Sequence, residues 1–340
     1  MNGQQVPILA FDGVSKAYVR PVDAAARIAG MFSGAGSRPV VHALERVTLA
    51  VGEGEVVGLV GESGSGKSTL GRIATGLLKP TSGALLWRGQ DVAAMDGKAR
   101  RAKQLAAQLI FQDPYASLNP RMRVADIVGE APVAHGLVPS REKNEYAAAM
   151  LQRVGLDAAM LQRYPHQFSG GQRARIGIAR ALAVRPQFLV CDEAVAALDV
   201  SIQAQVLNLF MQLRAELGLS YLFISHDLGV VRHVADRVAV LYLGRIVEVA
   251  PTEELFARAN HPYTVTLLAS MPTLEVTAKR HIPISGEVPS SLGPPSGCHF
   301  HPRCPHAMPR CRQEAPELRE VAPGHWAACH LNDGGGGIQR

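Results

Sequence analysis

Short apolar runs that end in polar residues alternate along the chain with segments of helical periodicity. The runs that read as buried strands are residues 55–60, 188–191, 221–225 and 238–243. The first of them continues into a glycine-rich turn and a helix that begins near Lys67. Residues 201–217 have the plainest helical pattern, because one face of the expected helix is apolar. That face carries Ile202, Val206, Leu209, Leu213 and Leu217. The alternation predicts an α/β fold with ligands at the carboxyl ends of its strands.

The middle of the chain is different, because strand-like runs fade between Gln112 and about Pro186. Three helical patterns replace them, so we expect a helical subdomain inserted in the α/β core. Residues 19–39 read as a loop or small insertion, and proline, glycine, histidine and cysteine become frequent from about Thr273. The expected parts are residues 1–112 (first part of the core), 113–186 (helical subdomain), 187–272 (second part of the core), 273–332 (C-terminal extension) and 333–340 (disordered tail).

Composition and charge narrow the class of protein. The chain of 340 residues is 47% hydrophobic and 19% charged, as in a globular protein. Its net charge is +6, but the basic residues are scattered. The densest cluster, residues 98–103, reads as a solvated face, so we expect no nucleic-acid partner. The sequence has neither a signal-peptide pattern nor an apolar run of about 18 residues. We therefore expect a cytosolic chain, whose thiols stay reduced.

The glycine-rich turn at residues 61–69, GESGSGKST, has the spacing of a phosphate-binding P-loop. Its glycines let the backbone curl so that several N–H groups converge on one phosphate, and the following helix adds its positive N-terminal end. Lys67 is expected to contact the β- and γ-phosphates, and the Ser68 hydroxyl to bind Mg²⁺. The expected nucleotide ligands are Gly61, Ser63, Gly64, Ser65, Gly66, Lys67, Ser68 and Thr69.

The strand-like run at residues 188–191 ends in two adjacent acids, Asp192 and Glu193. Asp192 stands where a carboxylate can hold Mg²⁺, and Glu193 can orient and polarise an attacking water. Together with the P-loop, these acids predict a hydrolase of ATP that uses Mg²⁺.

The segment FSGGQRARIGIARAL, residues 168–182, comes shortly before this acidic strand, and its SGGQ resembles the signature of ATP-binding cassette (ABC) ATPases. Glycine amides and a serine hydroxyl at a helix N-terminus again suit an anion. The signature residues are Ser169, Gly170, Gly171 and Gln172. The resemblance implies a P-loop NTPase fold of the ABC cassette type. Such a cassette has a mixed-sheet α/β core with an inserted helical subdomain, followed here by a small Cys-rich extension.

The same resemblance implies roles for four further residues. Gln112 looks like the Q-loop glutamine, which senses Mg²⁺ and water and couples to the membrane subunit. Asp199 resembles the D-loop aspartate of the dimer interface, and His226 resembles the switch histidine that contacts the γ-phosphate. Tyr18 is the expected stacking platform for adenine. Catalysis is thus assigned to Glu193, His226 and Gln112, and Mg²⁺ binding to Ser68, Gln112 and Asp192.

Four segments narrow the resemblance to the ATP-binding subunits of oligopeptide and dipeptide importers, and among these to the second of two paralogous ATPases. The segments are SLNPRM, YPHQFSGGQ, CDEAVAALDVSIQAQVLNLF and HPYTVTLLASMP. The likeness implies a translocase-type ATPase at the cytoplasmic face of the membrane, paired with a paralogous ATPase or a second copy of itself. Two permease subunits and an extracytoplasmic substrate-binding protein would complete the transporter. The alternative is a non-transport or accessory ABC ATPase, of a nucleic-acid or phosphonate-metabolism complex.

Four of the five cysteines lie in the C-terminal extension, at Cys298, Cys304, Cys311 and Cys329. Their spacing lacks the paired Cys-x₂-Cys knuckles of common zinc modules. The segment resembles the extension of peptide-importer ATPases, in which four cysteines can hold a [4Fe–4S] cluster that staples the tail. The alternatives are no metal, or Zn²⁺ with help from the histidines at His299, His301 and His306. Cys191 reads as a buried core residue.

Overall fold

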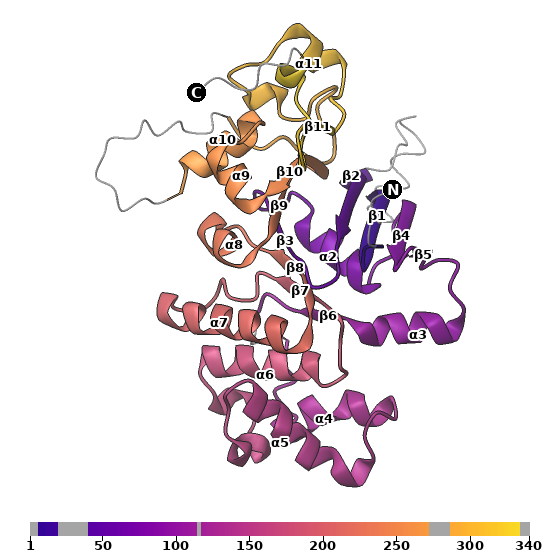
Figure 1. Ribbon diagram of the computed structural model, residues 1–340, viewed down its shortest axis with the longest axis vertical. Coiled ribbons are helices and arrows are strands. Elements are labelled where there is room, and N and C mark those ends of the chain that lie inside the picture. The colour runs from indigo at the N-terminus through magenta and orange to yellow at the C-terminus, as the bar shows by residue number, and fades with distance from the viewer. Residues whose placement is uncertain (1–5, 20–39, 114–116, 272–285, 334–340) are drawn as a thin grey trace, which may run out of the picture.

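The structure is a computed structural model that describes residues 6–19, 40–113, 117–271 and 286–333. Within these ranges the chain forms two β-sheets, helices that pack on the sheets, and a group of helices at one end (Figure 1). The predicted insertion at residues 19–39 lies outside the described residues except for Val19. The predicted disordered tail lies outside them except for Asp333, which is held by an ion pair to Arg310.

The larger sheet has the strand order β11-β12-β10-β9-β3-β8-β7-β6. Its parallel strands are β3 (Val56–Val60), β6 (Ala107–Ile110), β7 (Phe188–Asp192), β8 (Ser220–Ile224) and β9 (Arg237–Tyr242). Its antiparallel edge consists of β10 (Arg245–Pro251), β11 (Arg319–Ala322) and β12 (His325–Ala327). All four strands expected from the apolar runs are present, so the α/β prediction is confirmed.

Helices explain why the parallel strands read as unbroken apolar runs. Strand β3 lies between β8 and β9, with Val57 opposite Leu222 on one side and Arg237 on the other. Every residue of β3, β7 and β8 is buried, because helices pack on the sheet. Helices α2 (Lys67–Thr75) and α8 (Leu228–Val234) contact these strands, and Phe210 of α7 (Val200–Leu217) packs against Tyr221 and Phe223 of β8.

The smaller sheet is antiparallel and has the order β2-β1-β4-β5. Its strands are β1 (Leu9–Val19), β2 (Val40–Val51), β4 (Ser82–Trp87) and β5 (Gln90–Asp91). Leu9 is paired with Val51 on one side and with Trp87 on the other, and all three side chains are buried. This sheet shares its apolar core with the P-loop helix, because Leu44 and Val47 of β2 pack in the same cluster as Leu70 and Ile73 of α2.

The inserted helices form the end of the molecule opposite the C-terminal extension (Figure 1). They are α4 (Val124–Ala134), α5 (Lys143–Arg153) and α6 (Gly170–Leu182). Val128, Leu151 and Ile176, one from each helix, are fully buried in a common cluster. Helix α6 also packs on α7 (Val200–Leu217) and on β6, so the helical part is joined to the sheet by α6.

Helix α3 (Gly97–Ala106) carries the basic cluster that was expected to be solvated. Lys98, Arg100 and Arg101 are exposed, but Lys103 has only 2% of its surface exposed. Its ammonium donates a hydrogen bond to the carbonyl of Ala74, near the end of α2. The prediction was therefore wrong for Lys103, whose long side chain caps the P-loop helix.

The extension is docked on the cassette by strand pairing and by an aromatic side chain. Strand β12 adds to the sheet edge, with Ala327 opposite Glu248 of β10. Phe300 is 2% exposed, and its ring centroid lies 5.3 Å from that of Tyr242 and 5.4 Å from that of Tyr263. These contacts anchor the tail to the cassette, which the sequence did not predict. The helices of this region are α9 (Thr252–Ala257), α10 (Pro262–Ala269) and α11 (Pro309–Gln313).

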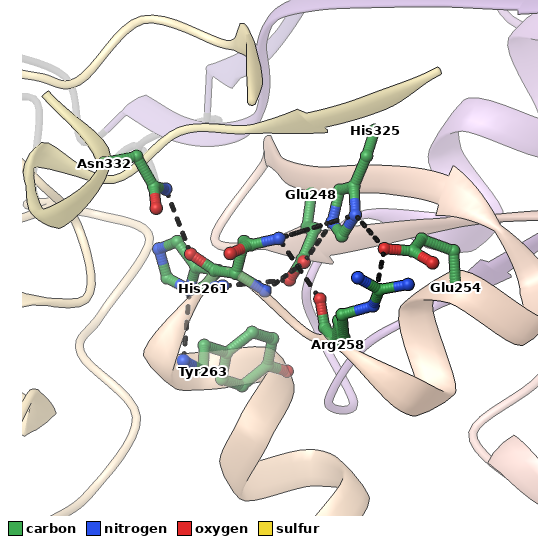
Figure 2. Close-up of polar contacts among 8 residues, drawn as sticks. Glu248, Glu254, Arg258, His261, Tyr263, His325 and Asn332 are labelled. Carbon is green, nitrogen blue, oxygen red and sulfur yellow. Dashed lines mark hydrogen bonds and ion pairs between the residues drawn. The ribbon is translucent and has the colours of Figure 1, made fainter. Parts of the chain in front are cut away.

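A buried polar network closes the same junction (Figure 2). The side chains of Glu248 and His325 are fully buried, with 2.7 Å between Glu248 Oε1 and His325 Nε2. The backbone N–H groups of Asn260 and His261 also donate to the Glu248 carboxylate. Asn332 completes the network by donating from its amide to the Asn260 carbonyl, at 3.1 Å. Each oxygen of the buried carboxylate thus has a donor, as burial of an acid requires.

No helix in the described ranges combines the length and the apolar character that are needed to cross a bilayer.

Candidate functional site

The P-loop connects the end of β3 to the start of α2 and depends on glycine at two crowded positions. Gly61 has φ +154°, and a Cβ there would lie 2.1 Å from the Leu241 carbonyl oxygen. Gly66 has φ +110°, and its Cβ would lie 2.4 Å from the Ala43 carbonyl oxygen. A side chain at either position would displace the backbone of β2 or β9, so the loop curls tightly only with glycine.

Lys67 is the cation at the centre of this loop. Its side chain is buried, and Nζ donates to the carbonyl oxygens of Gly61 at 2.8 Å and Glu62 at 2.9 Å. Burial lowers the pKa of Lys67, while the carboxylates of Glu193, Asp192 and Glu62 act in the opposite direction. The two hydrogen bonds hold the Lys67 amino group at the N-terminus of helix α2, where a phosphate would be bound.

Ser68 and Asp192 meet beside the lysine. The Ser68 hydroxyl donates to Asp192 Oδ1 at 3.0 Å, although the two residues lie on different elements, α2 and β7. Burial raises the pKa of Asp192; the Ser68 hydrogen bond lowers it, and the charge of Glu193 raises it. A hydroxyl and a carboxylate are the oxygen ligands that Mg²⁺ prefers, so this pair fits the metal.

Two predicted catalytic residues, Gln112 and His226, converge on one carboxylate oxygen of the third, Glu193. Gln112 Nε2 donates to Glu193 Oε2 at 2.8 Å, and His226 Nδ1 lies 3.3 Å from the same oxygen. Glu193 has φ +48°, a left-handed conformation that a non-glycine residue adopts at a cost of about 1–3 kcal/mol. Its backbone N–H donates to Ile224 of β8. The left-handed backbone thus orients the carboxylate toward Gln112 and His226. These residues follow β6 and β8, the two strands that flank β7.

A cavity of about 540 Å³ lies over these groups. Its lining consists of Val41, Ala43, Ser63, Gly64, Gly66, Lys67, Ser68, Thr69, Gln112, Glu193, His226 and Ser291. Tyr18 is not among the described residues that line it, but pairs across β1 and β2 with Val41, which does. The Tyr18 side chain is 37% exposed, and Lys16 Nζ lies 5.3 Å from its ring centroid. Stacking of adenine on Tyr18 stays a prediction.

The signature residues lie at the start of helix α6. Ser169 caps this helix, because its hydroxyl accepts the N–H of Gln172 and the Gln172 side chain accepts the N–H of Ser169. A Cβ at Gly171 would lie 2.4 Å from Ile202 on α7, so Gly171 allows α6 and α7 to pack. Among the described residues, those that line the P-loop cavity include no signature residue. Asp199 is exposed just before α7.

Comparison with known proteins identifies the family. A model described as ABC transporter matches residues 44–196, and one described as oligopeptide/dipeptide transporter, C-terminal region, matches residues 247–311. A probable peptide ABC transporter ATP-binding protein of Sinorhizobium fredii is 50% identical over 86% of this chain and 83% of its own length. The chain is an ATP-binding subunit of the peptide ABC transporter family. Oligopeptide transport ATP-binding protein AppF of Bacillus subtilis is also 50% identical, over 86% of this chain and 90% of its own.

Solved ABC structures share the fold of this subunit. The cbiO1 protein of Clostridium perfringens, part of the transporter complex cbiONQ, is 27% identical with a TM-score of 0.60, over 74% of this chain and 91% of its own. The ATP-binding cassette MJ0796, in a dimeric post-hydrolysis state with ADP and phosphate, has the same identity and TM-score. That match covers 72% of this chain and 98% of the other. The family match favours a transporter subunit over the non-transport or accessory ATPase that was the alternative.

The four cysteines of the peptide-transporter extension gather in space and are free thiols. Burial raises the pKa of Cys329 to about 12, and the nearby thiols of Cys298, Cys304 and Cys311 act in the same direction. Within the described ranges, however, no group of three or more Cys, His, Asp or Glu is arranged to hold a metal ion. The prediction of a [4Fe–4S] cluster or a zinc ion therefore has no support from this arrangement.

The histidines proposed as substitute ligands also face elsewhere or lie outside such a group. His299 Nδ1 lies 3.2 Å from the Leu243 carbonyl oxygen, and its Nε2 lies 3.5 Å from Glu45. His301 Nδ1 lies 2.9 Å from the Cys298 carbonyl oxygen, and His306 is exposed. The ring of His299 thus contributes to docking of the extension rather than to a metal site. Cys191 is fully buried on β7, which confirms the prediction of a core residue.

Sequence reasoning missed a group of contacts around Glu62, the second residue of the P-loop. Arg303 of the extension donates from Nη1 to Glu62 Oε2 at 2.7 Å and from Nη2 to Oε1 at 2.9 Å. Tyr263 of α10 accepts the backbone N–H of Glu62 on its hydroxyl, at 2.8 Å. Arg303 and Glu62 are 241 residues apart in the sequence. No periodicity or motif spacing could have paired them.

Proposed function

We propose that this subunit binds and hydrolyses ATP to energise the import of dipeptides or oligopeptides, as a peripheral protein at the cytoplasmic face of the cell membrane. The observation that carries the hydrolytic part is the convergence of Gln112 and His226 on Glu193, next to the Ser68–Asp192 pair. The transport part is supported by the similarity to a probable peptide ABC transporter ATP-binding protein and to an oligopeptide transport ATP-binding protein.

Each of these residues has a distinct task in the proposed reaction. Lys67 and the P-loop amides bind the phosphates, and Ser68 and Asp192 hold the metal. Bound Mg²⁺ supplies positive charge that neutralises the phosphate oxygens. The Glu193 carboxylate accepts a hydrogen bond from the attacking water and takes up its proton. Gln112 and His226 keep that carboxylate aimed, because each lies within reach of the same oxygen.

The proposed working unit contains two cassettes. The signature residues Ser169, Gly170 and Gly171 of one chain would close over a nucleotide bound to Lys67 of the other, and the exposed Asp199 would lie near the shared interface. The partner is a paralogous ATPase or a second copy of this chain. Support comes from the P-loop cavity, whose described lining lacks the signature of its own chain, and from the dimeric state of MJ0796. Two permease subunits and an extracytoplasmic binding protein complete the proposed importer.

Substitution of Glu193 tests the reaction. Glu193→Gln keeps the size of the side chain and its contacts with Gln112, but cannot take up a proton. We expect retained ATP binding and a turnover lower by about 10²–10⁴-fold. Lys67→Ala is the matched control, because it removes the phosphate cation and should weaken ATP binding itself. Binding by equilibrium dialysis and phosphate release from ATP give both readouts. Wild-type turnover in Glu193→Gln would contradict the assignment.

A metal in the extension is a separate prediction and is tested separately. It rests on the four cysteines in the sequence of the extension, Cys298, Cys304, Cys311 and Cys329, because no group of three or more potential ligands among the described residues is arranged to hold a metal ion. Iron, sulfide and zinc analysis of anaerobically purified protein distinguishes a [4Fe–4S] cluster, a zinc ion and free thiols. The visible absorption of an iron–sulfur cluster is absent from a zinc site.

A further inference from the structure

The C-terminal extension contacts the P-loop of this cassette through an ion pair between Arg303 and Glu62. Arg303 lies in a short 3₁₀ turn, His301–Arg303, and its side chain is only 5% exposed. Both of its terminal nitrogens donate to the two oxygens of Glu62, a forked geometry that fixes orientation as well as distance. The Tyr242 ring lies beside the guanidinium, with 5.8 Å between the ring centroid and Cζ. Arg303 is thus held in place by the cassette core while it holds Glu62.

Tyr263 provides a second hold on the same residue. Its side chain is fully buried, and its hydroxyl accepts the Glu62 N–H. At the other end of the residue, the Tyr263 N–H donates to His261 Nδ1 at 3.0 Å. The His261 N–H donates to Glu248, the partner of His325 on β12 (Figure 2). Glu248, His261 and Tyr263, each hydrogen-bonded to the next, therefore connect the extension strand β12 to the backbone of Glu62.

These contacts bear on Lys67. The Glu62 carbonyl accepts a hydrogen bond from Lys67 Nζ, so the position of the Glu62 peptide helps to set the position of the phosphate-binding cation. Between Gly61 and Gly66 the loop is rich in glycine and serine. Ordering such a loop costs conformational entropy, and this cost is smaller when one of its residues is already fixed. A loop held in its binding shape spends less free energy on ordering when the ligand arrives.

The extension also reaches the cavity itself. Ser291 is one of its lining residues, and the Ser291 carbonyl accepts the N–H of His42 on β2, at 3.0 Å. Thus the extension contacts both the P-loop, at Glu62, and the lining of the adjacent cavity, through Ser291.

We propose that the C-terminal extension preorganises the P-loop through Glu62, and that Arg303 is a positioning residue for ATP binding. This inference rests on the proposed ATPase function. Since Arg303 acts before the chemical step, its loss removes binding that is common to ground state and transition state. KM should then rise while kcat stays the same. A purely structural role predicts the reverse, because partial loss of folded protein lowers apparent kcat at unchanged KM.

A double-mutant cycle on full-length protein tests the coupling, with ATP and magnesium as the probe. We expect Arg303→Met to raise the Kd and KM for ATP about tenfold, with kcat within about twofold of wild type. In the Glu62→Gln background the same substitution should change Kd by less than about twofold, because the fork no longer exists. Arg303→Lys keeps the charge but not the fork, and should lie between wild type and Arg303→Met.

Arg310→Gln is the matched control. Arg310 is an arginine of the same extension, paired with Glu314 and Asp333 at the surface and not with the P-loop, so KM should stay at the wild-type value. Equal effects of Arg303→Met with and without Glu62→Gln would overturn the inference, as would a fall in kcat at constant KM. If Arg303→Met does not fold, Arg303→Lys and Glu62→Gln supply the cycle. Failure of the wild-type protein to bind ATP would instead refute the proposed function on which the inference rests.

Discussion

Lys103 of helix α3 is nearly fully buried, and its ammonium donates its hydrogen bond to the Ala74 carbonyl at the end of the P-loop helix. Among the described residues, no carboxylate lies within ion-pair distance of it. Burial of a cation without a counter-charge opposes its charged form. We therefore predict that replacing Lys103 by methionine changes the pH dependence of stability in a defined direction.

The magnitude follows from the pKa. Burial lowers the pKa of Lys103 from 10.5 to about 8. Between these values the unfolded chain binds more protons than the folded one, so the free energy of unfolding rises with pH. The free-energy penalty for burying the charged amine is absent above pH 10.5, where the amine is neutral. It grows as the pH falls and reaches its full size below pH 8. The shift of 2.5 pKa units (10.5 minus 8) corresponds to about 3 kcal/mol, of which about 2 kcal/mol is recovered between pH 7 and pH 9.5.

The assay compares urea unfolding of wild type and Lys103→Met at pH 7 and pH 9.5, followed by the fluorescence of the two tryptophans, buried Trp87 and exposed Trp326. The stability of Lys103→Met relative to wild type should be about 2 kcal/mol more favourable at pH 7 than at pH 9.5. Effects of the substitution that do not depend on the protonation of Lys103 are the same at both values and cancel in this difference. Lys98→Met, on the exposed side of the same helix, controls for removal of a positive charge. An unchanged difference between the two pH values would refute the reasoning.

Three further substitutions test the site and the docking of the extension. Phe300→Ala should destabilise the protein by about 3–5 kcal/mol and speed proteolysis between the extension and the cassette, because a buried aromatic is lost; equal cleavage rates would contradict this docking. His325→Ala leaves the buried Glu248 carboxylate without its side-chain partner, so thermal unfolding should show a loss of about 3–5 kcal/mol, smaller for His325→Gln. Ser68→Ala removes a proposed Mg²⁺ ligand, and a titration of ATPase activity should show a higher magnesium requirement than for wild type.

The parallel core could be predicted, and so could the proximity of most of the proposed catalytic residues, because their signals are local. An apolar run followed by a glycine turn and a helix defines the P-loop without knowledge of the rest of the chain. The predicted partners Ser68 and Asp192 then meet because β3 and β7 are both strands of one parallel sheet, whose carboxyl ends share an edge.

The antiparallel edge and the burial of Lys103 could not be predicted. Strand β12 has three residues, His325–Ala327, too few for a periodic pattern, and it becomes a strand only by pairing with β10. The cluster at residues 98–103 reads as polar throughout, and only the packing of α3 against the rest of the core distinguishes Lys103 from its neighbours. Tertiary context decides both cases.

The contact of Arg303 with Glu62 indicates that the extension and the cassette form one structural unit. It immediately precedes Cys304, and Phe300 follows Cys298 by two residues, yet Phe300 packs in the aromatic core and Arg303 reaches the P-loop. Docking and the gathered thiols therefore use different side chains of the same short segment. Because the docking side chains come from between the cysteines, the segment cannot change shape around its thiols without moving groups that hold Glu62. The cysteines are therefore distant from the P-loop in the sequence but are linked to it in the fold through Arg303, the neighbour of Cys304.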